Sequence, residues 1–348
     1  MNRNPFIAGS WVRGDNFFGR ADLLREVLEG ARDALWVVGA RRIGKTSLLK
    51  ELERRVQASP QSAFVPLYWD IQGSGDGRGL AESLVESIED SEGFRRATDV
   101  ATEDLEGLSV HEMLTTTVRR TVRSGWRLLL LVEEAEELLV LGRHDPALVA
   151  RLRRVLQKGP DVRTVLTSTR RLARLDELVD FATSPFLHGF TPPLYLTPLR
   201  PDEARALLAR GRFAEADVQE IVARTAGHPF LVQLIASRLF EGRDLAAVLE
   251  QVASDDMVAN FFSVDHDTLE PAERRMLEAS ARLGAATRAQ LSDATGLADE
   301  AAASVLYGRE MMGYLAVESG RYRVGNWFFE RWLRRVGTER AAAAAGGA

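Results

Sequence analysis

The sequence predicts an α/β fold in which a parallel β-sheet flanked by helices is followed by a helical section and a final unit of helices and a hairpin. Three observations support this prediction. Short apolar runs alternate with helical stretches over residues 1–199, as in a parallel sheet whose strands are buried on both faces. Residues 200–256 show helical patterns. Residues 257–337 end in two short strands and a helix.

Composition limits the possible classes of protein. The 348 residues, 45% hydrophobic and 27% charged, suit a soluble globular protein of two or three domains. The net charge of −5 gives no sign of a nucleic-acid or membrane partner. The chain has no cysteine, which excludes disulfides, thiolate zinc sites and a cysteine nucleophile. The aliphatic run at 128–132 is too short for a membrane span, and the first residues lack the apolar region of a secretory signal, so we expect a cytoplasmic location.

The first functional motif lies between an apolar run, 34–38, and a helical stretch that begins near residue 47. Residues 39–46 have the spacing G-x-x-x-x-G-K-[ST] of a phosphate-binding loop, in the strand–loop–helix context that the motif requires. We expect the loop backbone to surround nucleotide phosphates, Lys45 to reach the β- and γ-phosphates, and Thr46 to bind Mg²⁺. The predicted phosphate-binding residues are Gly39, Arg41, Arg42, Ile43, Gly44, Lys45, Thr46 and Ser47.

An alternative interpretation is a glycine-containing loop that binds nothing. The lysine count argues against it, because only Lys45, Lys50 and Lys158 occur among 45 basic residues. A chain that uses arginine almost everywhere places a lysine where a compact ammonium group is needed.

Residues 4–20 are rich in aromatic residues, Gly and Pro, and they precede a predicted amphipathic helix at 21–28. Phe18 and Arg20 are candidates for nucleotide contacts on the adenine side, because a base stacks on apolar and aromatic surface. The alternative is an N-terminal arm that packs on the core.

The second strand is predicted over residues 63–70, where Pro66 indicates an edge strand or a bulge. A helix is expected from about residue 80 to 88. Residues 89–108 are acidic and weakly periodic, so we expect a surface insertion there, followed by a helix at 111–123.

A continuous apolar run from residue 126 ends in Glu133 and Glu134, and ligands of open α/β sheets bind beyond the carboxyl ends of strands. We expect Glu133 to hold Mg²⁺ through water and Glu134 to orient or activate the attacking water. The first acid of such a motif is usually Asp. The extra methylene of Glu shifts the carboxylate by about 1.5 Å, and a misplacement of that order can cost about 100-fold in rate. The alternative is that the glutamates at 133, 134, 136 and 137 only favour the positive end of the next helix.

A predicted basic helix at 148–156 contains Arg153 and Arg154, and the next strand, 163–171, ends in small hydroxyl residues and Arg170. Arg170 is expected to sense the γ-phosphate, and Arg153 or Arg154 to act in trans as an arginine finger in an oligomer. Solvated surface arginines are the alternative for each of them.

The last core strand is predicted at 195–199, and helices are predicted within 201–226 and at 231–240. Before the second of these, Gly227, His228 and Pro229 form a rigid turn, and His228 and Pro229 are candidates for nucleotide contacts. The alternative is a plain link between two helices.

From residue 267 the pattern gives three short helices, a hairpin and a last helix at 327–335, which is the order of a winged helix. Thr287 with Gln290 forms a capping box, and Gly296 ends the same helix. The third helix, 299–312, offers acids and alanines where residues that read bases would stand, so an intramolecular or protein-contact role is favoured over DNA binding. Residues 338–348 are expected to form a disordered Ala/Gly tail.

These features together resemble the STAND branch of AAA+-like P-loop ATPases, the prokaryotic ATPases similar to archaeal AAA-type proteins. The matching pieces are Asn4-Pro5-Phe6, Phe18-Gly19-Arg20, the loop at 39–46, Glu133-Glu134, Thr167-Ser168-Thr169-Arg170, Pro198-Leu199, Gly227-His228-Pro229 and the winged helix. The resemblance implies a P-loop NTPase core at 1–199, an α-helical lid at 200–256 and a winged-helix domain at 257–337 that close over the nucleotide. It also implies a switch, in which ADP holds a closed monomer and ATP permits a homo-oligomer or assembly with a partner protein.

The chain departs from this family in two respects. Plant- and apoptosome-type relatives carry a His-Asp pair that reads the ADP phosphate, where this chain has Gly325-Asn326. Family members usually carry an effector domain or a sensor repeat, and neither is found in this sequence. The expected function is therefore an ATP- and Mg²⁺-binding switch ATPase with slow hydrolysis and partner chains for its output. Two alternatives stay open: a DNA-binding initiator similar to archaeal origin-recognition proteins, and a degenerate ATPase that uses nucleotide structurally within a protein complex.

Overall fold

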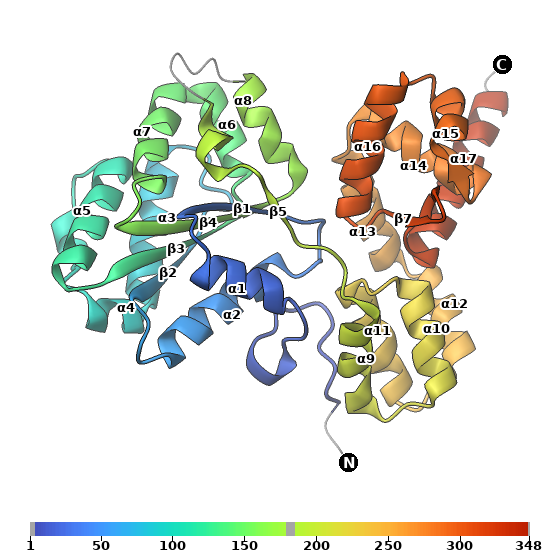
Figure 1. The fold of residues 1–348 in the computed structure, drawn as a ribbon, viewed down its shortest axis with the longest axis horizontal. Coiled ribbons are helices and arrows are strands. Elements are labelled where there is room, and N and C mark those ends of the chain that lie inside the picture. Colours follow the sequence, from blue (N-terminus) through green and yellow to red (C-terminus); the bar gives the residue numbers. More distant parts are fainter. Residues whose placement is uncertain (1–3, 179–184, 347–348) are drawn as a thin grey trace. The chain divides into compact units, whose positions relative to one another are not determined.

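A computed structural model of the chain describes residues 4–178 and 185–346 (Figure 1). The chain divides into two compact units. The sheet unit comprises Trp11–Gly39 and Gly44–Leu196, and the helical unit comprises Met1–Ser10, Ala40–Ile43 and Thr197–Ala348.

The N-terminal segment differs from expectation, because it groups with the helical unit and not with the sheet. The Asn4 side-chain amide donates to the Ser237 carbonyl (3.1 Å), and the Ile7 N–H donates to the Gln233 side chain (3.0 Å). These bonds hold residues 4–7 against residues 233–237 of the same unit.

The sheet unit is built on five parallel strands in the order β2-β3-β4-β1-β5. The strands are β1 (Ala34–Val38), β2 (Phe64–Asp70), β3 (Arg127–Glu133), β4 (Val162–Ser168) and β5 (Leu194–Tyr195). β1, β3 and β4 are almost wholly buried, as expected of central parallel strands covered on both faces. The predicted α/β class is confirmed, and Pro66 lies in an edge strand as predicted. β5 is shorter than the predicted strand at 195–199.

Helices cover both faces of this sheet (Figure 1). α1 (Ala21–Glu29) and α2 (Lys45–Ala58) pack together on one face. α3 (Gly77–Asp90), α5 (Val110–Arg123) and α7 (Pro146–Leu156) lie side by side on the other. The shorter elements are α4 (Glu92–Ala97), α6 (Glu137–His144), α8 (Leu175–Leu178) and 3₁₀ turns at Gly14–Asn16, Thr102–Leu105, Arg170–Arg174 and Phe186–Phe190.

Residues 89–108 do not form the surface insertion that the sequence predicted. This segment forms α4 and a 3₁₀ turn, and it buries Phe94 and Leu105 completely. α4 packs on α3 and β2. The segment is acidic, and its buried apolar residues, Phe94, Val100 and Leu105, are too widely spaced to produce a periodic pattern.

The helical unit contains nine helices within its described residues and a three-stranded antiparallel sheet of order β6-β8-β7. The helices are α9 (Pro201–Leu208), α10 (Glu215–Thr225), α11 (Pro229–Phe240), α12 (Leu245–Ala253), α13 (Asp256–Asp267), α14 (Pro271–Leu283), α15 (Arg288–Thr295), α16 (Asp299–Met311) and α17 (Trp327–Gly346); the strands are β6 (Ala286–Thr287), β7 (Leu315–Glu318) and β8 (Arg321–Val324). The predicted capping box of Thr287 with Gln290 is present, and Gly296 ends α15 in the left-handed conformation.

The last helix is longer than predicted. α17 continues to Gly346, past the predicted end at residue 335 and through most of the segment expected to be disordered. The run of alanines from residue 341 explains the difference, because alanine has the highest helix propensity. Residues 347 and 348 of the predicted tail lie outside the described ranges. Among the described residues, none of the helices has the length and apolar character that a membrane span requires.

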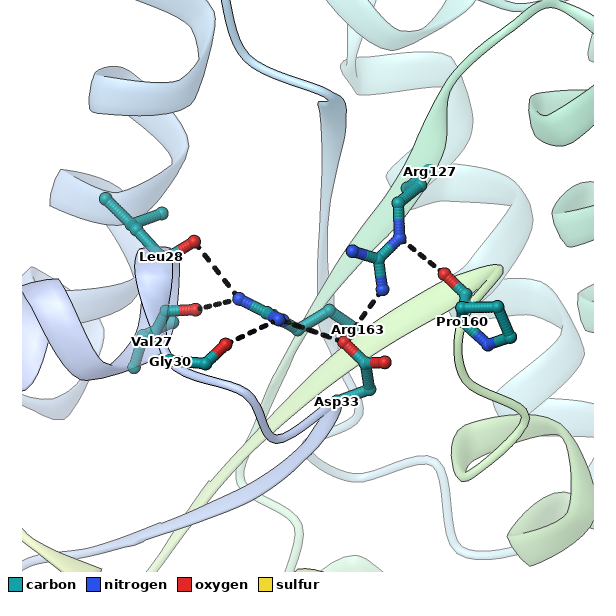
Figure 2. A network of polar contacts seen from close by, with 7 residues as sticks. All are labelled: Val27, Leu28, Gly30, Asp33, Arg127, Pro160 and Arg163. Carbon is teal, nitrogen blue, oxygen red and sulfur yellow. Dashed lines mark hydrogen bonds and ion pairs between the residues drawn. The ribbon is translucent and has the colours of Figure 1, made fainter.

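An ion-pair network centred on the buried Arg163, with the partly exposed Asp33 and Arg127, joins elements at the amino-terminal edge of the sheet (Figure 2). Arg163 of β4 donates to the carbonyls of Val27 (2.9 Å), Leu28 (3.1 Å) and Gly30 (2.9 Å) at the end of α1, and it lies 3.0 Å from Asp33. Arg127, at the start of β3, pairs with the same Asp33 oxygen at 2.8 Å. The network thus joins α1, β3, β4 and the residue before β1, and it fixes the strands whose opposite ends form the candidate site.

Candidate nucleotide-binding site

The predicted phosphate-binding loop connects β1 to α2, as the motif requires. Gly44 has φ +106° and Arg42 has φ +56°. A Cβ at Gly44 would meet no described atom within 4 Å, so a glycine is needed there for its backbone conformation and not for space. Gly44 precedes the first residue of α2 and makes no side-chain hydrogen bond to its first turn, and the N-terminus of a helix is favourable for an anion.

Lys45 is the first residue of α2, and its side chain is buried. Its ammonium group lies 3.4 Å from the Gly39 carbonyl and so folds back across the start of the loop. This is a suitable position for a point charge that neutralises phosphates bound by the loop.

Thr46 and Glu133 meet at the carboxyl-terminal edge of the sheet, although 87 positions separate them in the sequence. The Thr46 hydroxyl hydrogen-bonds Oε1 of Glu133, at the end of β3, and the Glu133 side chain is only 4% exposed. The two residues predicted to hold Mg²⁺ are therefore in contact.

Tyr68 of β2 completes this cluster. Its hydroxyl donates to the second carboxylate oxygen of Glu133, Oε2. Burial, together with the hydrogen bond and the charge of Glu133, raises the pKa of Tyr68 far above its ordinary value, so the phenol stays protonated as a donor. The Lys50 ammonium lies over the Tyr68 ring, 3.3 Å from its centroid. Sequence reasoning did not identify Tyr68, because nothing local to residues 63–70 marks it as a partner of Glu133.

The donor atoms of this cluster fit Mg²⁺. The ion prefers hard oxygen ligands and is usually bound by one or two protein groups together with nucleotide phosphates. The Thr46 hydroxyl and the Glu133 carboxylate supply such oxygens next to the loop. These two residues would hold the ion there.

Glu134 follows β3 in the left-handed conformation, with φ +53°. This region is costly for a residue other than glycine, and such residues concentrate at functional sites. Six non-glycine residues of the described ranges have positive φ, and three of them, Arg20, Arg42 and Glu134, are predicted site residues. The chain beyond Glu134 is held to the end of β4, since Ala135 N–H donates to the Thr167 carbonyl (3.1 Å) and Thr169 N–H to the Glu136 carboxylate.

Arg170 begins the 3₁₀ turn after β4, the strand between β1 and β3. It therefore stands at the same edge of the sheet as the loop and Glu134. On α7, Arg153 is partly buried and Arg154 is exposed, so Arg154 is the more available of the two predicted trans arginines.

The segment from residue 11 to 16 is tied to α2. The Val12 N–H donates to the Ser47 hydroxyl (3.0 Å), and the Gly14 N–H donates to the Glu51 carboxylate (2.8 Å). Ser47, predicted to bind phosphate, thus uses its hydroxyl to hold this segment. Phe18 and Arg20 are partly buried, and Arg20 precedes α1 with φ +66°. Their predicted nucleotide contacts stay a prediction.

Glu51 is a second residue that sequence reasoning missed. Burial alone would raise its pKa, but hydrogen bonds from Arg54, Arg55 and the Gly14 N–H outweigh burial and lower the pKa of Glu51 to about 2. The carboxylate is charged at neutral pH and anchors the N-terminal segment on the helix that follows the loop.

In the helical unit, the turn at Gly227 is fixed by close packing. Gly227 has φ +73°, its carbonyl accepts from Leu199 N–H (2.9 Å), and a Cβ would lie 2.0 Å from the Leu199 carbonyl oxygen. His228 is buried, caps α11 and lies 5.6 Å from the Phe261 ring, and Pro229 is the first residue of α11.

Arg42 groups with this unit. Its guanidinium lies over the Phe230 ring at 4.4 Å and 5.7 Å from the Phe261 centroid. Arg42 is therefore engaged in a cation–π contact, while Arg41 is exposed and Ile43 is buried.

Comparison with known proteins agrees with this geometry. Residues 28–175 match the family model described as an AAA domain, a segment that contains the loop, Glu133 and Arg170. A search of curated proteins found no match.

Two solved structures cover nearly the whole chain. The Walker-type ATPase paby2304 of Pyrococcus abyssi is 18% identical, with a TM-score of 0.71, over 95% of this chain and 99% of its own. The ORC2 protein of Aeropyrum pernix, solved as ADPNP-ADP complexes, is 16% identical, with a TM-score of 0.59, over 95% of this chain and 98% of its own. The chain therefore has the fold of a P-loop NTPase, similar to AAA-type ATPases, with a helical C-terminal region.

Proposed function

We propose that this protein is a switch ATPase of the STAND type, which binds ATP with Mg²⁺ and hydrolyses it slowly. The observation that supports this most directly is the contact between Thr46, one residue after Lys45 in the loop, and Glu133 at the end of β3. A loop that bound no nucleotide would have no need of a buried carboxylate at this position, because burying an ionised group is costly.

Each residue of the cluster has a role in this proposal. Lys45 and the N–H groups at the start of α2 bind the phosphates, and Thr46 with Glu133 holds the ion. Bound Mg²⁺ supplies charge neutralisation at the β- and γ-phosphates. Glu134 accepts the proton of the water that attacks the γ-phosphorus, and Arg170 stabilises charge on the phosphoryl group as its bond to ADP breaks.

The switch is assigned to the helical unit. We propose that α9 to α12 form the lid of residues 200–256, and that α14 to α16 with the β7–β8 hairpin form the winged helix of residues 257–337. The exchange of ADP for ATP permits assembly with further copies or with a partner protein. Asn326 stands where relatives carry part of a His-Asp pair, and its contact agrees with a different role in this chain. Its side chain is buried and accepts a hydrogen bond from the Phe329 N–H (2.8 Å) at the start of α17. The oxygen of that side chain is used to hold the start of α17.

DNA binding is the second candidate, and the likeness to the ORC2 protein favours it. The chemistry of α16 argues against it. Its first turn carries Asp299 and Glu300, and its arginine, Arg309, is 1% exposed and pairs with Glu273 at 2.9 Å. A helix whose cation is buried presents little to base edges or phosphates. Duplex binding that weakens with salt, measured from about 50 mM upward, would support an initiator.

Nucleotide binding is tested by thermal unfolding of protein stripped of nucleotide. ATP·Mg²⁺ at 100 times its dissociation constant should stabilise the fold by about 2.7 kcal/mol. Lys45→Ala should abolish the shift. Lys158→Ala, which removes an exposed lysine paired with Asp161 (3.7 Å), should keep it. An unchanged melting curve, or full binding by Lys45→Ala, would exclude the proposal.

Hydrolysis is tested separately by phosphate release. Glu134→Gln should abolish release while ATP binding persists, and Glu137→Gln, three residues further along, should retain it. Binding without release in the unaltered protein would instead favour a degenerate ATPase that uses nucleotide structurally. The mass in solution with ADP and with ATP tests assembly.

A further inference from the structure

We infer that Tyr68 is a positioning residue for magnesium, which acts by orienting the Glu133 carboxylate. The inference rests on the proposed function, since it concerns how Mg²⁺ is held with ATP. It starts from the arrangement in which two hydroxyl groups approach the two oxygens of one buried carboxylate: Thr46 at Oε1 and Tyr68 at Oε2.

The register of the sheet explains why a tyrosine can do this. β2 and β3 are parallel neighbours in which Asp70 lies opposite Glu133 and Tyr68 lies opposite Leu131. Tyr68 and Asp70 project from the same face of β2, one strand repeat of about 7 Å apart. A phenol ring is long enough to cross this diagonal and reach the carboxylate at the strand end.

The contact also explains how a glutamate can serve at position 133, where the first acid of such a motif is usually aspartate. Glutamate has one more rotatable bond than aspartate, so its carboxylate has more orientations to choose from. Ordering it costs conformational entropy. The Tyr68 bond holds Oε2, and the oxygen that remains, Oε1, faces Thr46. The Glu133 carboxylate is thereby restricted to one orientation. Aspartate, with one rotatable bond fewer, would need less restriction.

Lys50 restricts Tyr68 in turn. Its ammonium lies 3.3 Å from the ring centroid and 3.5 Å from Glu53 on the same helix. A cation placed on the ring face opposes rotation of the phenol away from Glu133. The second of the three lysines thus supports the metal site from α2, the helix that also carries Thr46.

The test compares the Mg²⁺ requirement of ATP binding in the unaltered protein and in Tyr68→Phe, which removes only the hydroxyl. Fluorescent ATP is first bound without Mg²⁺, and Mg²⁺ is then titrated. ATP affinity without Mg²⁺ should be unchanged, and the Mg²⁺ concentration at half effect should rise 10- to 100-fold, as is typical when an outer-shell partner is lost. Tyr307→Phe, at an exposed site, is the matched control and should leave both values unchanged.

A double-mutant cycle separates positioning from a general structural effect. If Tyr68 acts through Glu133, adding Tyr68→Phe to Glu133→Gln should weaken Mg²⁺ binding no further than Glu133→Gln alone. Lys50→Gln should shift the Mg²⁺ requirement in the same direction by a smaller factor, and it serves as a second variant if Tyr68→Phe folds poorly.

The outcomes distinguish the two proposals. A Mg²⁺ requirement in Tyr68→Phe within twofold of the unaltered protein, or additive effects in the cycle, would overturn the role of Tyr68 and leave ATP binding intact. Failure of the unaltered protein to bind ATP would overturn both.

Discussion

Replacing Arg163 by methionine should remove a large part of the stability of the sheet unit. The side chain is 5% exposed, donates to three carbonyls at the end of α1 and pairs with Asp33 (Figure 2). Methionine would fill the space but leave these acceptors without their donor. Removing one partner of a fully buried ion pair costs about 3–5 kcal/mol, and here the partly exposed Asp33 lowers the cost while the three carbonyls that lose their donor add to it. Because Asp33 keeps its pair with Arg127, we expect about 3 kcal/mol.

The loss is measured by urea unfolding, with thermal melting as a second probe. For a domain of this size, 3 kcal/mol corresponds to a fall of about 6–12 °C in Tm. Arg163→Lys should lose an intermediate amount, since an ammonium cannot reproduce the planar set of donors. Arg154→Met, at an exposed position of α7 that forms no ion pair among the described residues, should change stability by less than about 0.5 kcal/mol. A loss below about 1 kcal/mol for Arg163→Met would refute the reasoning.

Three further predictions concern other parts of the fold. Against the effect of burial, the hydrogen bonds of Glu51 lower its pKa from 4.5 to about 2, so the ionised carboxylate stabilises the folded protein by about 3 kcal/mol above pH 4.5, and this contribution is lost as pH falls through 2. The difference in unfolding free energy between the unaltered protein and Glu51→Gln, followed by urea unfolding from pH 7 downward, should be constant above pH 5 and narrow below it. A difference that stays constant at low pH would contradict the assignment. Gly227→Ala should lower the free energy of unfolding by more than about 2 kcal/mol in the same assay, because its Cβ would meet the Leu199 carbonyl. Gly242→Ala, with φ +84° and no described atom within 4 Å of the new Cβ, should cost only about 1–2 kcal/mol of backbone strain. Equal losses would show that the close approach at Gly227 is not decisive. Phe94→Ala should cost about 3–5 kcal/mol, while a loss below 1 kcal/mol would restore the interpretation of residues 89–108 as a surface insertion.

The residues that sequence reasoning found are those whose chemistry depends on neighbours in the chain. The loop is contiguous, so its spacing alone predicted Lys45 and Thr46 as neighbours just before a helix expected from about residue 47, and the helix begins two residues earlier, at Lys45. Glu133 followed from the rule that parallel strands present ligands at their carboxyl ends, and its contact with Thr46 agrees with that rule.

The residues that it missed depend on register and packing between distant segments. Tyr68 reaches Glu133 only because β2 pairs with β3 in one register, which no property of residues 63–70 reveals. Arg163 stands alone between Val162 and Thr164 in a β-branched strand, and its burial follows from the end of α1 lying against β4. Glu51 looks like one more charged residue on a helix until the N-terminal segment is placed on it.

The network around Asp33 has a consequence for any survey of variants that scores nucleotide binding in cells. It lies at the amino-terminal ends of β1, β3 and β4, while the loop and Arg170 follow the carboxyl-terminal ends of β1 and β4, and Glu133 is the last residue of β3. Substitutions at Asp33 or Arg163 should reduce how many molecules are folded without changing the affinity of those that remain. If only the total nucleotide bound is measured, such variants would be indistinguishable from variants of Lys45. Binding normalised to the amount of folded protein would separate loss of abundance from loss of recognition.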